Sequence, residues 1–135
     1  MIGAGHQIVF QFNGTINNAG NVTVKDASNA DVGNATLSFN NSEVVVTLTN
    51  VPDSKRVTIT LMGVNGTANP TVAMGFLVGD VTNSRSVNAA DIAAVKARVN
   101  QAVTNANFKY DINASGTISS ADVSAVKARA GMVLP

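Results

Sequence analysis

The sequence contains no cysteine and no tryptophan, and its single histidine is His6. Without cysteine, disulfide bonds cannot hold the fold together, and small extracellular domains that lack disulfides often use a metal ion instead. Without tryptophan, and with phenylalanines at predicted core positions, the chain has no aromatic platform for binding sugars. These absences direct attention to residues that could bind a metal.

Charge is also scarce. Charged residues make up 13% of the chain and the net charge is +1. Because no basic stripe accompanies this balance, nucleic-acid binding is not predicted. No apolar run reaches the ~20 residues of a membrane span, and no signal-peptide pattern opens the chain. We therefore expect a fragment from the C-terminal end of a longer secreted protein.

The sequence shows no catalytic constellation. His6 stands alone near the start, and no serine lies in a nucleophile-elbow pattern. The acids outside the loops described below, Asp26, Asp31, Glu43 and Asp53, fall in predicted turns or strand edges, whereas glycoside hydrolysis needs two acids in a cleft. We predict neither an enzyme nor a site for a small-molecule substrate.

The hydrophobic period divides the chain into two parts. Residues 7–76 alternate apolar and polar side chains, and turn sequences such as Asn13-Gly14 and Asn65-Gly66 separate the runs. Six or seven short strands of this kind predict a β-sandwich over residues 1–77. After Gly79 the apolar residues fall at helical spacing, which predicts a second, helical domain over residues 78–135.

The helical part contains an internal duplication. The segment Asp91-Ile92-Ala93-Ala94-Val95-Lys96-Ala97-Arg98 aligns with Asp122-Val123-Ser124-Ala125-Val126-Lys127-Ala128-Arg129, at an offset of 31 residues. The same offset carries Asp80 onto Asp111. A common offset for loops and helices is evidence of a true repeat, which we place at residues 79–101 and 110–131.

Each repeat begins with a twelve-residue candidate calcium loop, over residues 80–91 and 111–122. Calcium takes six to eight oxygen ligands, and an EF-hand loop supplies them from positions 1, 3, 5, 7, 9 and 12. In the first loop these positions hold Asp80, Thr82, Ser84, Ser86, Asn88 and Asp91, and in the second Asp111, Asn113, Ser115, Thr117, Ser119 and Asp122. Position 7 would use its carbonyl and position 9 a water molecule. Up to two calcium ions are predicted.

The pattern Gly79-Asp80-Val81, Val87-Asn88, Asp91-Ile92 and Lys96 resembles the dockerin repeat, which has Asp at position 12 and one helix after each loop. The resemblance implies an all-α dockerin with paired EF-hand-like loop–helix motifs over residues 78–135. Residues 1–77 look, more loosely, like the immunoglobulin-like or X-type modules that precede dockerins in bacteria. The expected fold is therefore an all-β immunoglobulin-like sandwich followed by an all-α dockerin.

The loops also depart from the dockerin pattern. Ser84 and Ser115 occupy position 5, where Asp is usual, so each loop keeps only two carboxylates. Position 6 favours glycine because its φ is positive, and it holds Gly116 in the second loop but Arg85 in the first. We expect the second loop to be the better calcium site. A metal-free alternative remains, in which Asp91 and Asp122 serve only to start helices.

The resemblance further implies a surface that binds a cohesin. Dockerins use helix residues near loop positions 10, 11, 17 and 18. In this chain those positions, with the neighbouring arginines, are Ala89, Ala90, Lys96, Ala97, Arg98, Ser120, Ala121, Lys127, Ala128 and Arg129. Seven residues span about two helical turns, so these positions share a face. The alternative is that they are ordinary solvated surface.

Three functions remain open from the sequence. The first is a non-catalytic, calcium-dependent docking module that attaches a secreted protein, such as a polysaccharide-degrading enzyme of a cellulosome, to a cohesin-bearing scaffold. The second is a structural C-terminal module that calcium stabilises and that has no cohesin partner. The third is sugar binding by the predicted sandwich.

Overall fold

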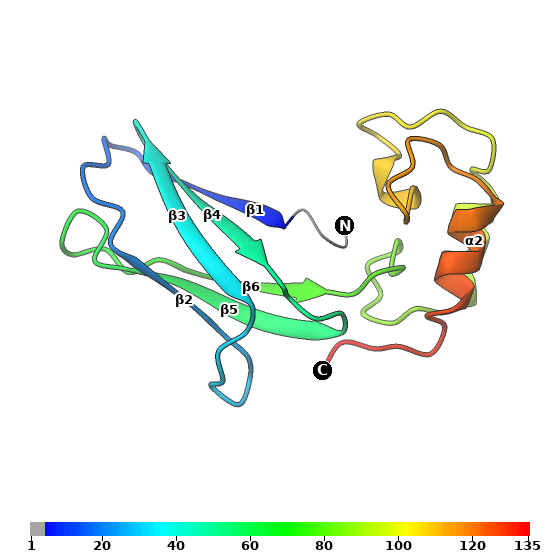
Figure 1. The fold of residues 1–135 in the computed structure, drawn as a ribbon, viewed down its shortest axis with the longest axis horizontal. Helices are drawn as coiled ribbons and strands as arrows, with labels where there is room; N and C mark the ends of the chain where they lie inside the picture. The colour runs from blue at the N-terminus through cyan, green and yellow to red at the C-terminus, as the bar shows by residue number, and fades with distance from the viewer. Residues whose placement is uncertain (1–4) are drawn as a thin grey trace. The chain divides into compact units, whose positions relative to one another are not determined.

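The computed structural model describes residues 5–135. Over these residues the chain forms six strands, two α-helices and one 3-10 turn (Figure 1). The strands are β1 (His6–Gln11), β2 (Asn21–Lys25), β3 (Asn34–Asn40), β4 (Glu43–Thr49), β5 (Lys55–Met62) and β6 (Thr71–Phe76). The later elements are α1 (Ala89–Lys96), η1 (Phe108–Tyr110) and α2 (Ser120–Lys127). Residue contacts divide the chain between Gly75 and Phe76 into a strand unit, residues 5–75, and a loop–helix unit, residues 76–135.

The strand unit consists of two three-stranded sheets, in the orders β1-β4-β3 and β2-β5-β6. Strands β1 and β3 both run antiparallel to the central strand β4, and β2 runs antiparallel to β5. The register follows the alternation in the sequence. In β4, Val44, Val46 and Leu48 are buried, while Val45 and Thr47 between them are partly exposed. A one-residue slip would turn the apolar set to water, so this alternation determines the register.

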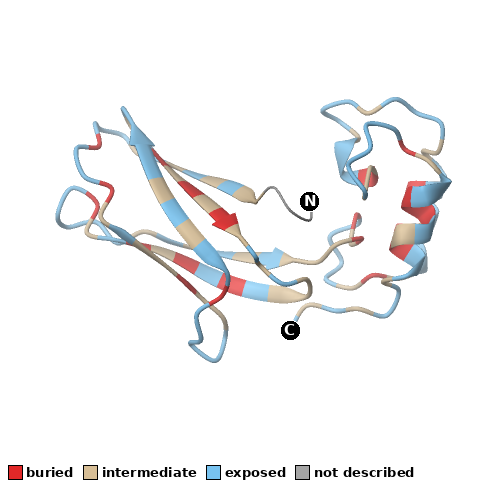
Figure 2. Cartoon of the chain, viewed as in Figure 1, coloured by how far each residue is buried: buried red, intermediate tan, exposed pale blue. Residues whose placement is uncertain are grey.

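The core of the strand unit lies against the two central strands. Val57, Ile59 and Leu61 of β5 are as fully buried as the alternate valines of β4. Figure 2 shows these residues as separate bands along each strand, with partly or fully exposed residues between them. Burying a side chain of this size contributes about 1.5–3 kcal/mol, so the six side chains of β4 and β5 are a large part of what stabilises this unit.

Asparagine is abundant in the turns because it tolerates a left-handed backbone better than other residues with a side chain. Six asparagines among the described residues have positive φ angles: Asn29, Asn41, Asn50, Asn65, Asn83 and Asn100. Asn41 makes the turn between β3 and β4, and Asn100 follows α1. The composition of the chain thus reflects its many tight turns.

The loop–helix unit has a small core of its own. It is formed by Val81, Val87, Val95, Tyr110, Ile118, Val123 and Val126, with Ile92, Val99 and Met132 packed against it. Tyr110 covers this core with 8% of its surface exposed. Phe108 is 64% exposed, so the expectation that the phenylalanines occupy core positions is wrong for this residue. The two residues lie on η1, a single tight turn that presents them to opposite environments.

The expected fold class, an immunoglobulin-like sandwich followed by an all-α dockerin, is wrong. Across residues 5–135 strands outweigh helices, and the chain is mostly β. The two sheets have only three strands each, and the two helices have only eight residues each. The helices are short because Asn100 and Gly131, with φ angles of 71° and 93°, turn the chain away four residues after each helix ends. After each helix the chain forms an isolated β-bridge instead of further helical turns. Ala102, after α1, pairs with Thr117, and Val133, after α2, pairs with Ser86.

None of the helices formed by the described residues combines the length and the apolar character that a membrane span requires.

Candidate functional site

Two buried carboxylates stand at the centre of the loop–helix unit. Asp91 and Asp122 occupy position 12 of the two loops, and neither exposes any surface. One oxygen of Asp91, Oδ1, accepts hydrogen bonds from the N–H and the hydroxyl of Thr82, at 2.9 and 2.8 Å. The other, Oδ2, accepts from the N–H of Asn88 at 2.9 Å. Asp91 therefore joins the start of its loop to the start of α1.

Asp122 repeats this arrangement in the second loop. Its Oδ1 accepts from the N–H of Asn113 at 3.2 Å, and its Oδ2 accepts from the N–H of Ser119 at 2.8 Å. Both helices thus begin with a capping box, in which Asn88 or Ser119 caps the helix and the aspartate three residues later bonds back. The helix-start role named in the metal-free alternative is present in the structure. It does not exclude a metal, because each carboxylate also faces its loop.

Hydrogen bonds keep both aspartates in the charged form. Burial is the largest single influence on the pKa of Asp91 and would raise it. The bonds donated by Asn88, by Thr82 and by the N–H of Val81 together outweigh burial and hold the pKa below its usual value. The pKa of Asp122 is lowered in the same way, against burial, chiefly by bonds from Ser119 and Asn113.

The aspartates at position 1 order the middle of each loop. Oδ1 of Asp80 accepts from the N–H of Ser84 at 2.9 Å, and Oδ2 accepts from the N–H of Arg85 at 2.7 Å. Asp111 makes the equivalent bonds with Ser115 and Gly116, at 2.9 and 2.8 Å. The two loops therefore have the same internal geometry despite their different residues.

The oxygens of the first loop converge on one another. The hydroxyl of Thr82 lies 2.8 Å from Oδ1 of Asp91 and 3.5 Å from Oδ1 of Asp80. The hydroxyl of Ser84 lies 3.5 Å from the same Asp80 oxygen and 2.9 Å from the carbonyl oxygen of Ser86. Ligands bound to calcium at 2.3–2.6 Å lie roughly 3 Å apart, so these five oxygens are spaced as calcium ligands are. The donor set of the first loop fits the metal.

The second loop brings together a similar set. The hydroxyl of Ser115 lies 3.4 Å from Oδ1 of Asp111 and 3.1 Å from the carbonyl oxygen of Thr117. The side-chain oxygen of Asn113 accepts from the N–H of Ser115 at 3.1 Å, and Asp122 closes the loop from the helix side. This loop also fits calcium, since oxygen is the only donor element that its residues offer.

Carboxylates are few at both sites. Over residues 5–135, no three Asp, Glu, His or Cys side chains gather in the way a metal cluster requires. Each loop instead combines two carboxylates with neutral oxygens. The two carboxylates together balance the charge of one divalent ion. At position 9, the side-chain oxygen of Asn88 is occupied as the cap of α1, bonding the N–H of Ala90 at 2.8 Å. Ser119 likewise bonds Ala121 at 3.2 Å, so position 9 serves the helix.

The backbone shows where each loop is strained. Position 6 has a positive φ in both loops, 68° at Arg85 and 88° at Gly116, as the loop pattern predicts. Position 4 is also left-handed, with φ of 60° at Asn83 and 55° at Ala114. Such angles are tolerated by glycine and asparagine and disfavoured for arginine and alanine. Each loop therefore has one favourable and one unfavourable residue, at exchanged positions.

This geometry agrees with a comparison of the sequence with protein families. Residues 78–129 match the dockerin type I domain. The match covers less than half of the chain, so it concerns the loop–helix unit and gives no support to an immunoglobulin-like or X-type module in residues 1–77. A comparison with curated proteins found no match. Dockerin type I domains are, as a family, non-catalytic modules of calcium-dependent docking, and that general character is what the match supports for this segment.

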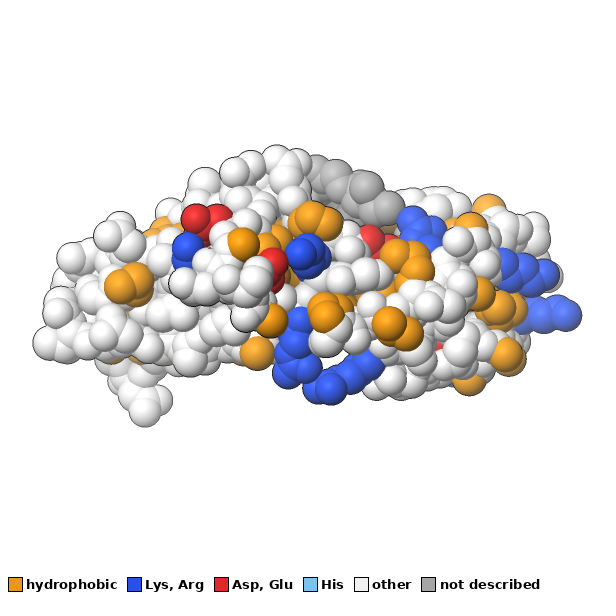
Figure 3. Space-filling view, turned by 90° about the horizontal axis from the view of Figure 1, so that it is seen from below, with side chains coloured by type: hydrophobic (Ala, Val, Ile, Leu, Met, Phe, Trp, Pro, Cys, Tyr) orange, Lys and Arg blue, Asp and Glu red, His pale blue; other side chains and the backbone are white. Residues whose placement is uncertain are grey.

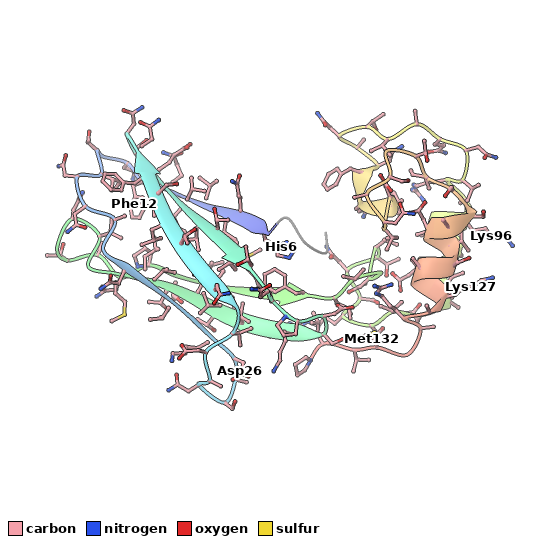
Figure 4. All side chains as sticks on the ribbon, viewed as in Figure 1. His6, Phe12, Asp26, Lys96, Lys127 and Met132 are labelled. Atoms are coloured by element: carbon pink, nitrogen blue, oxygen red, sulfur yellow. The ribbon has the colours of Figure 1, made fainter. Side chains whose placement is uncertain are left out.

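The loop–helix unit presents the predicted docking positions to solvent. All eight residues at loop positions 10, 11, 17 and 18 are exposed: Ala89, Ala90, Lys96, Ala97, Ser120, Ala121, Lys127 and Ala128. Figure 4 shows the labelled lysines, Lys96 and Lys127, along the outer side of the helical pair. On the molecular face seen in Figure 3, Lys and Arg side chains form several groups, and one of them lies beside Asp or Glu. The exposed surface of the two helices thus consists mainly of small side chains, and Lys96 and Lys127 supply its positive charge.

The two arginines predicted beside this surface are placed differently. The guanidinium group of Arg98 donates to the carbonyl of Ala94 at 2.8 Å and lies over the ring of Tyr110, and Arg98 is only partly exposed. Arg129, also partly exposed, donates to the carbonyl of Ala125 at 3.0 Å. Both arginines bond to carbonyls of their own helices.

Sequence reasoning missed one residue that supports a loop. The ammonium group of Lys109 donates to the carbonyl of Val81, at position 2 of the first loop, over 2.8 Å. The repeat offset places Val78 opposite Lys109, so the repeat carries no signal for this contact. Only the folded structure brings the two residues together.

Proposed function

We propose that the chain divides into domains at residues 1–77 and 78–135, and that the second is a non-catalytic dockerin domain that binds a cohesin-type module when calcium is present. It would anchor a secreted protein, for example a polysaccharide-degrading one, to a scaffold or a bacterial cell surface. The observation that carries this proposal is that each candidate calcium loop runs directly into the helix that carries the docking positions. Asp91 and Asp122 each belong to a candidate calcium site and to the first turn of a helix with an exposed docking face.

The calcium ligands in this proposal are the oxygens that converge in the two loops. They come from Asp80, Thr82, Ser84, Ser86 and Asp91, and from Asp111, Asn113, Ser115, Thr117 and Asp122, with Asn88 and Ser119 holding the helix starts. Calcium would supply the positive charge that allows two carboxylates and several neutral oxygens to lie this close together. The second loop is proposed to bind more tightly because Gly116 occupies position 6, where the loop pattern favours glycine, even though Ala114 bears strain at position 4.

The docking surface in this proposal is the exposed face of α1 and α2. Alanine and serine at loop positions 10 and 11 allow a partner backbone to approach closely, and Lys96 and Lys127 offer charge to partner carboxylates. Arg98 and Arg129 would contribute by holding the helix ends, since both donate to carbonyls of their own helices. The partner is therefore expected to present a surface with carboxylates at two points.

The test is binding of the full chain to purified type I cohesin modules, in calcium and in excess chelator. We expect binding in calcium only. The double charge reversal Lys96→Glu/Lys127→Glu should weaken it at least tenfold, because both charges face the partner. The matched control is Lys25→Glu/Arg56→Glu on strands β2 and β5, which should leave affinity unchanged. Equal effects of the two double variants would contradict the proposed surface.

A second candidate is a calcium-stabilised structural domain without a cohesin partner. The observation in its favour is that Arg98 and Arg129 donate hydrogen bonds to carbonyls of the same unit. Lys96 and Lys127 are then the charged side chains left on the exposed face. If the chain binds calcium and melts at a higher temperature with it, but binds no cohesin module, this second function is the correct one.

A further inference from the structure

Strand β1 forms one edge of its three-stranded sheet. In the order β1-β4-β3 it pairs with β4, and Figure 1 shows it on the outer side of that strand. The strand at the opposite edge, β3, contacts β2 of the other sheet as well as its neighbour β4. The β1 side is therefore the more open edge of this sheet.

The register with β4 shows which backbone groups of β1 point outward. The N–H of Phe12, directly after β1, donates to the carbonyl of Ser42 at 2.8 Å and continues the ladder between β1 and β4. In an antiparallel ladder, alternate residues of an edge strand bond to the neighbouring strand, and the residues between them direct their N–H and C=O groups the other way. Gln7, Val9 and Gln11 therefore direct these groups away from β4.

The side chains of β1 do not protect this edge. Native proteins often block an edge strand with charged residues, a proline or a β-bulge. Residues 7–11 read Gln-Ile-Val-Phe-Gln, with no charge and no proline, and their register with β4 is continuous. Val9, at the middle of the segment, is 53% exposed. The edge therefore favours pairing with another strand.

The core face beside this edge is incompletely covered. Ile8 and Phe10 lie opposite Val46 and Val44 in the register, on the face that packs into the core. The two valines expose none of their surface, whereas Ile8 and Phe10 are partly exposed. Side chains directly opposite each other on antiparallel strands lie about 4.5–5.5 Å apart. A further strand with apolar side chains at the matching positions would therefore cover Ile8 and Phe10.

The same segment is chemically symmetric about Val9. When two copies run antiparallel with Val9 opposite Val9, each Gln7 faces Gln11 of the second copy, and each Ile8 faces Phe10. The three residues with outward backbone groups then meet in hydrogen-bonded pairs, while apolar side chains meet on the core face. One surface is used twice, as a closed two-fold dimer requires.

From this symmetry we propose that the edge formed by residues 7–11 binds the same edge of a second copy of the chain. The two sheets then join into one six-stranded sheet, in the order β3-β4-β1-β1-β4-β3. The second copy is the occupant because its segment matches the edge at every position, in hydrogen bonding and in side-chain character. The contact concerns the strand unit and does not depend on the calcium sites.

Cysteine cross-linking of the full chain tests the register. The chain has no cysteine of its own, so a single introduced cysteine can form a disulfide only with another copy. A disulfide needs Cα atoms within about 7 Å, and a hydrogen-bonded antiparallel pair places them about 5.5 Å apart. We expect Val9→Cys to cross-link under mild oxidation. Gln7→Cys is the matched control, because its copies lie four residues apart along the ladder, about 13 Å.

A double variant completes the register test. Gln7→Cys/Gln11→Cys should cross-link, since each cysteine then faces the other kind across the two-fold axis. Equal cross-linking of Val9→Cys and Gln7→Cys would overturn the proposed register, because random collision between exposed cysteines would explain both.

Sedimentation equilibrium tests the dimer without a covalent bond. The average mass of the original full chain should rise with concentration towards that of two chains. Val9→Lys places two like charges opposite each other on the axis and should raise the dissociation constant at least ~10-fold. Ala73→Lys adds the same charge at an exposed position of β6, an edge strand of the other sheet, and should change nothing.

Two outcomes of sedimentation would overturn the proposal. A chain that stays monomeric up to its solubility limit would show that a second copy does not occupy this edge. A dimer that Val9→Lys and Ala73→Lys weaken equally, or that neither weakens, would show that the copies meet through another surface.

Discussion

The guanidinium carbon of Arg98 lies 3.9 Å from the centre of the Tyr110 ring. Arg98 lies in the first repeat, two residues after the end of α1, and Tyr110 directly precedes Asp111, the first residue of the second loop. The ammonium group of Lys109 lies 5.1 Å from the same ring. A ring that is almost wholly buried thus holds a cation from the opposite repeat, in an arrangement that contributes ~0.5–2 kcal/mol.

Replacing this ring should destabilise the loop–helix unit. We expect Tyr110→Leu to lower the free energy of unfolding by about 1–2 kcal/mol, because the cation loses its aromatic face and the smaller side chain leaves space in the core. Tyr110→Phe keeps the ring and should stay within about 0.5 kcal/mol of the original chain. Thermal unfolding followed by circular dichroism measures both. A Phe variant as unstable as the Leu variant would show that the ring contact contributes nothing.

The two loops provide a matched test of backbone strain at position 6. Arg85→Gly should stabilise the unit by about 1 kcal/mol, because arginine pays for its left-handed φ and glycine does not. The reverse change, Gly116→Arg, should destabilise it by a similar amount. Denaturant unfolding can be followed by the fluorescence of Tyr110, which is the only tyrosine in a chain without tryptophan and so reports on this unit. The two variants must change the free energy of unfolding in opposite directions, and changes in the same direction would refute the strain argument.

Stability should fall in acid through the buried aspartates. The folded pKa values of Asp91 and Asp122 lie below their usual value, whereas an unfolded aspartate titrates near 3.9. Their contribution is therefore complete above about pH 5 and is lost as the pH falls below about 4 towards the folded pKa values. The free energy of unfolding of the loop–helix unit, measured by Tyr110 fluorescence, should be flat from pH 7 to 5 and then decline.

The control for this decline separates the two units. Asp91→Asn/Asp122→Asn should flatten the acid decline seen by Tyr110 fluorescence. Asp26→Asn should leave it unchanged, although hydrogen bonds, first from the Ser28 hydroxyl, also lower the pKa of Asp26. Asp26 belongs to the strand unit, where it pairs with Lys55. An unchanged acid decline in the double variant would mean that other groups cause it.

Local patterns predicted much of this molecule. The alternation of Val44, Val46 and Leu48 gave the buried face of β4, and the repeat offset gave the register of the loops and helix starts. The positive φ at position 6 followed from the EF-hand pattern. These features depend on residues close together in the chain, so the sequence alone suffices to locate them.

Other features depend on contacts between distant residues, and the sequence did not reveal them. The segments that follow the two helices pair with the opposite loops instead of continuing as helix. Phe108 and Tyr110 are both aromatic but differ in exposure, since Tyr110 packs into the core of the loop–helix unit, where it also meets Arg98. The all-α expectation failed because the two α-helices have only eight residues each and strands outweigh helices across the described residues.

The central claim is that the two loops bind calcium, and titration calorimetry of the full chain with calcium chloride tests it most directly. We predict heat that saturates at two ions per chain, a melting temperature that falls in excess chelator, and loss of both effects in the double variant Asp80→Asn/Asp111→Asn. A chain that gives no binding heat and melts at the same temperature with calcium and with chelator would contradict the claim.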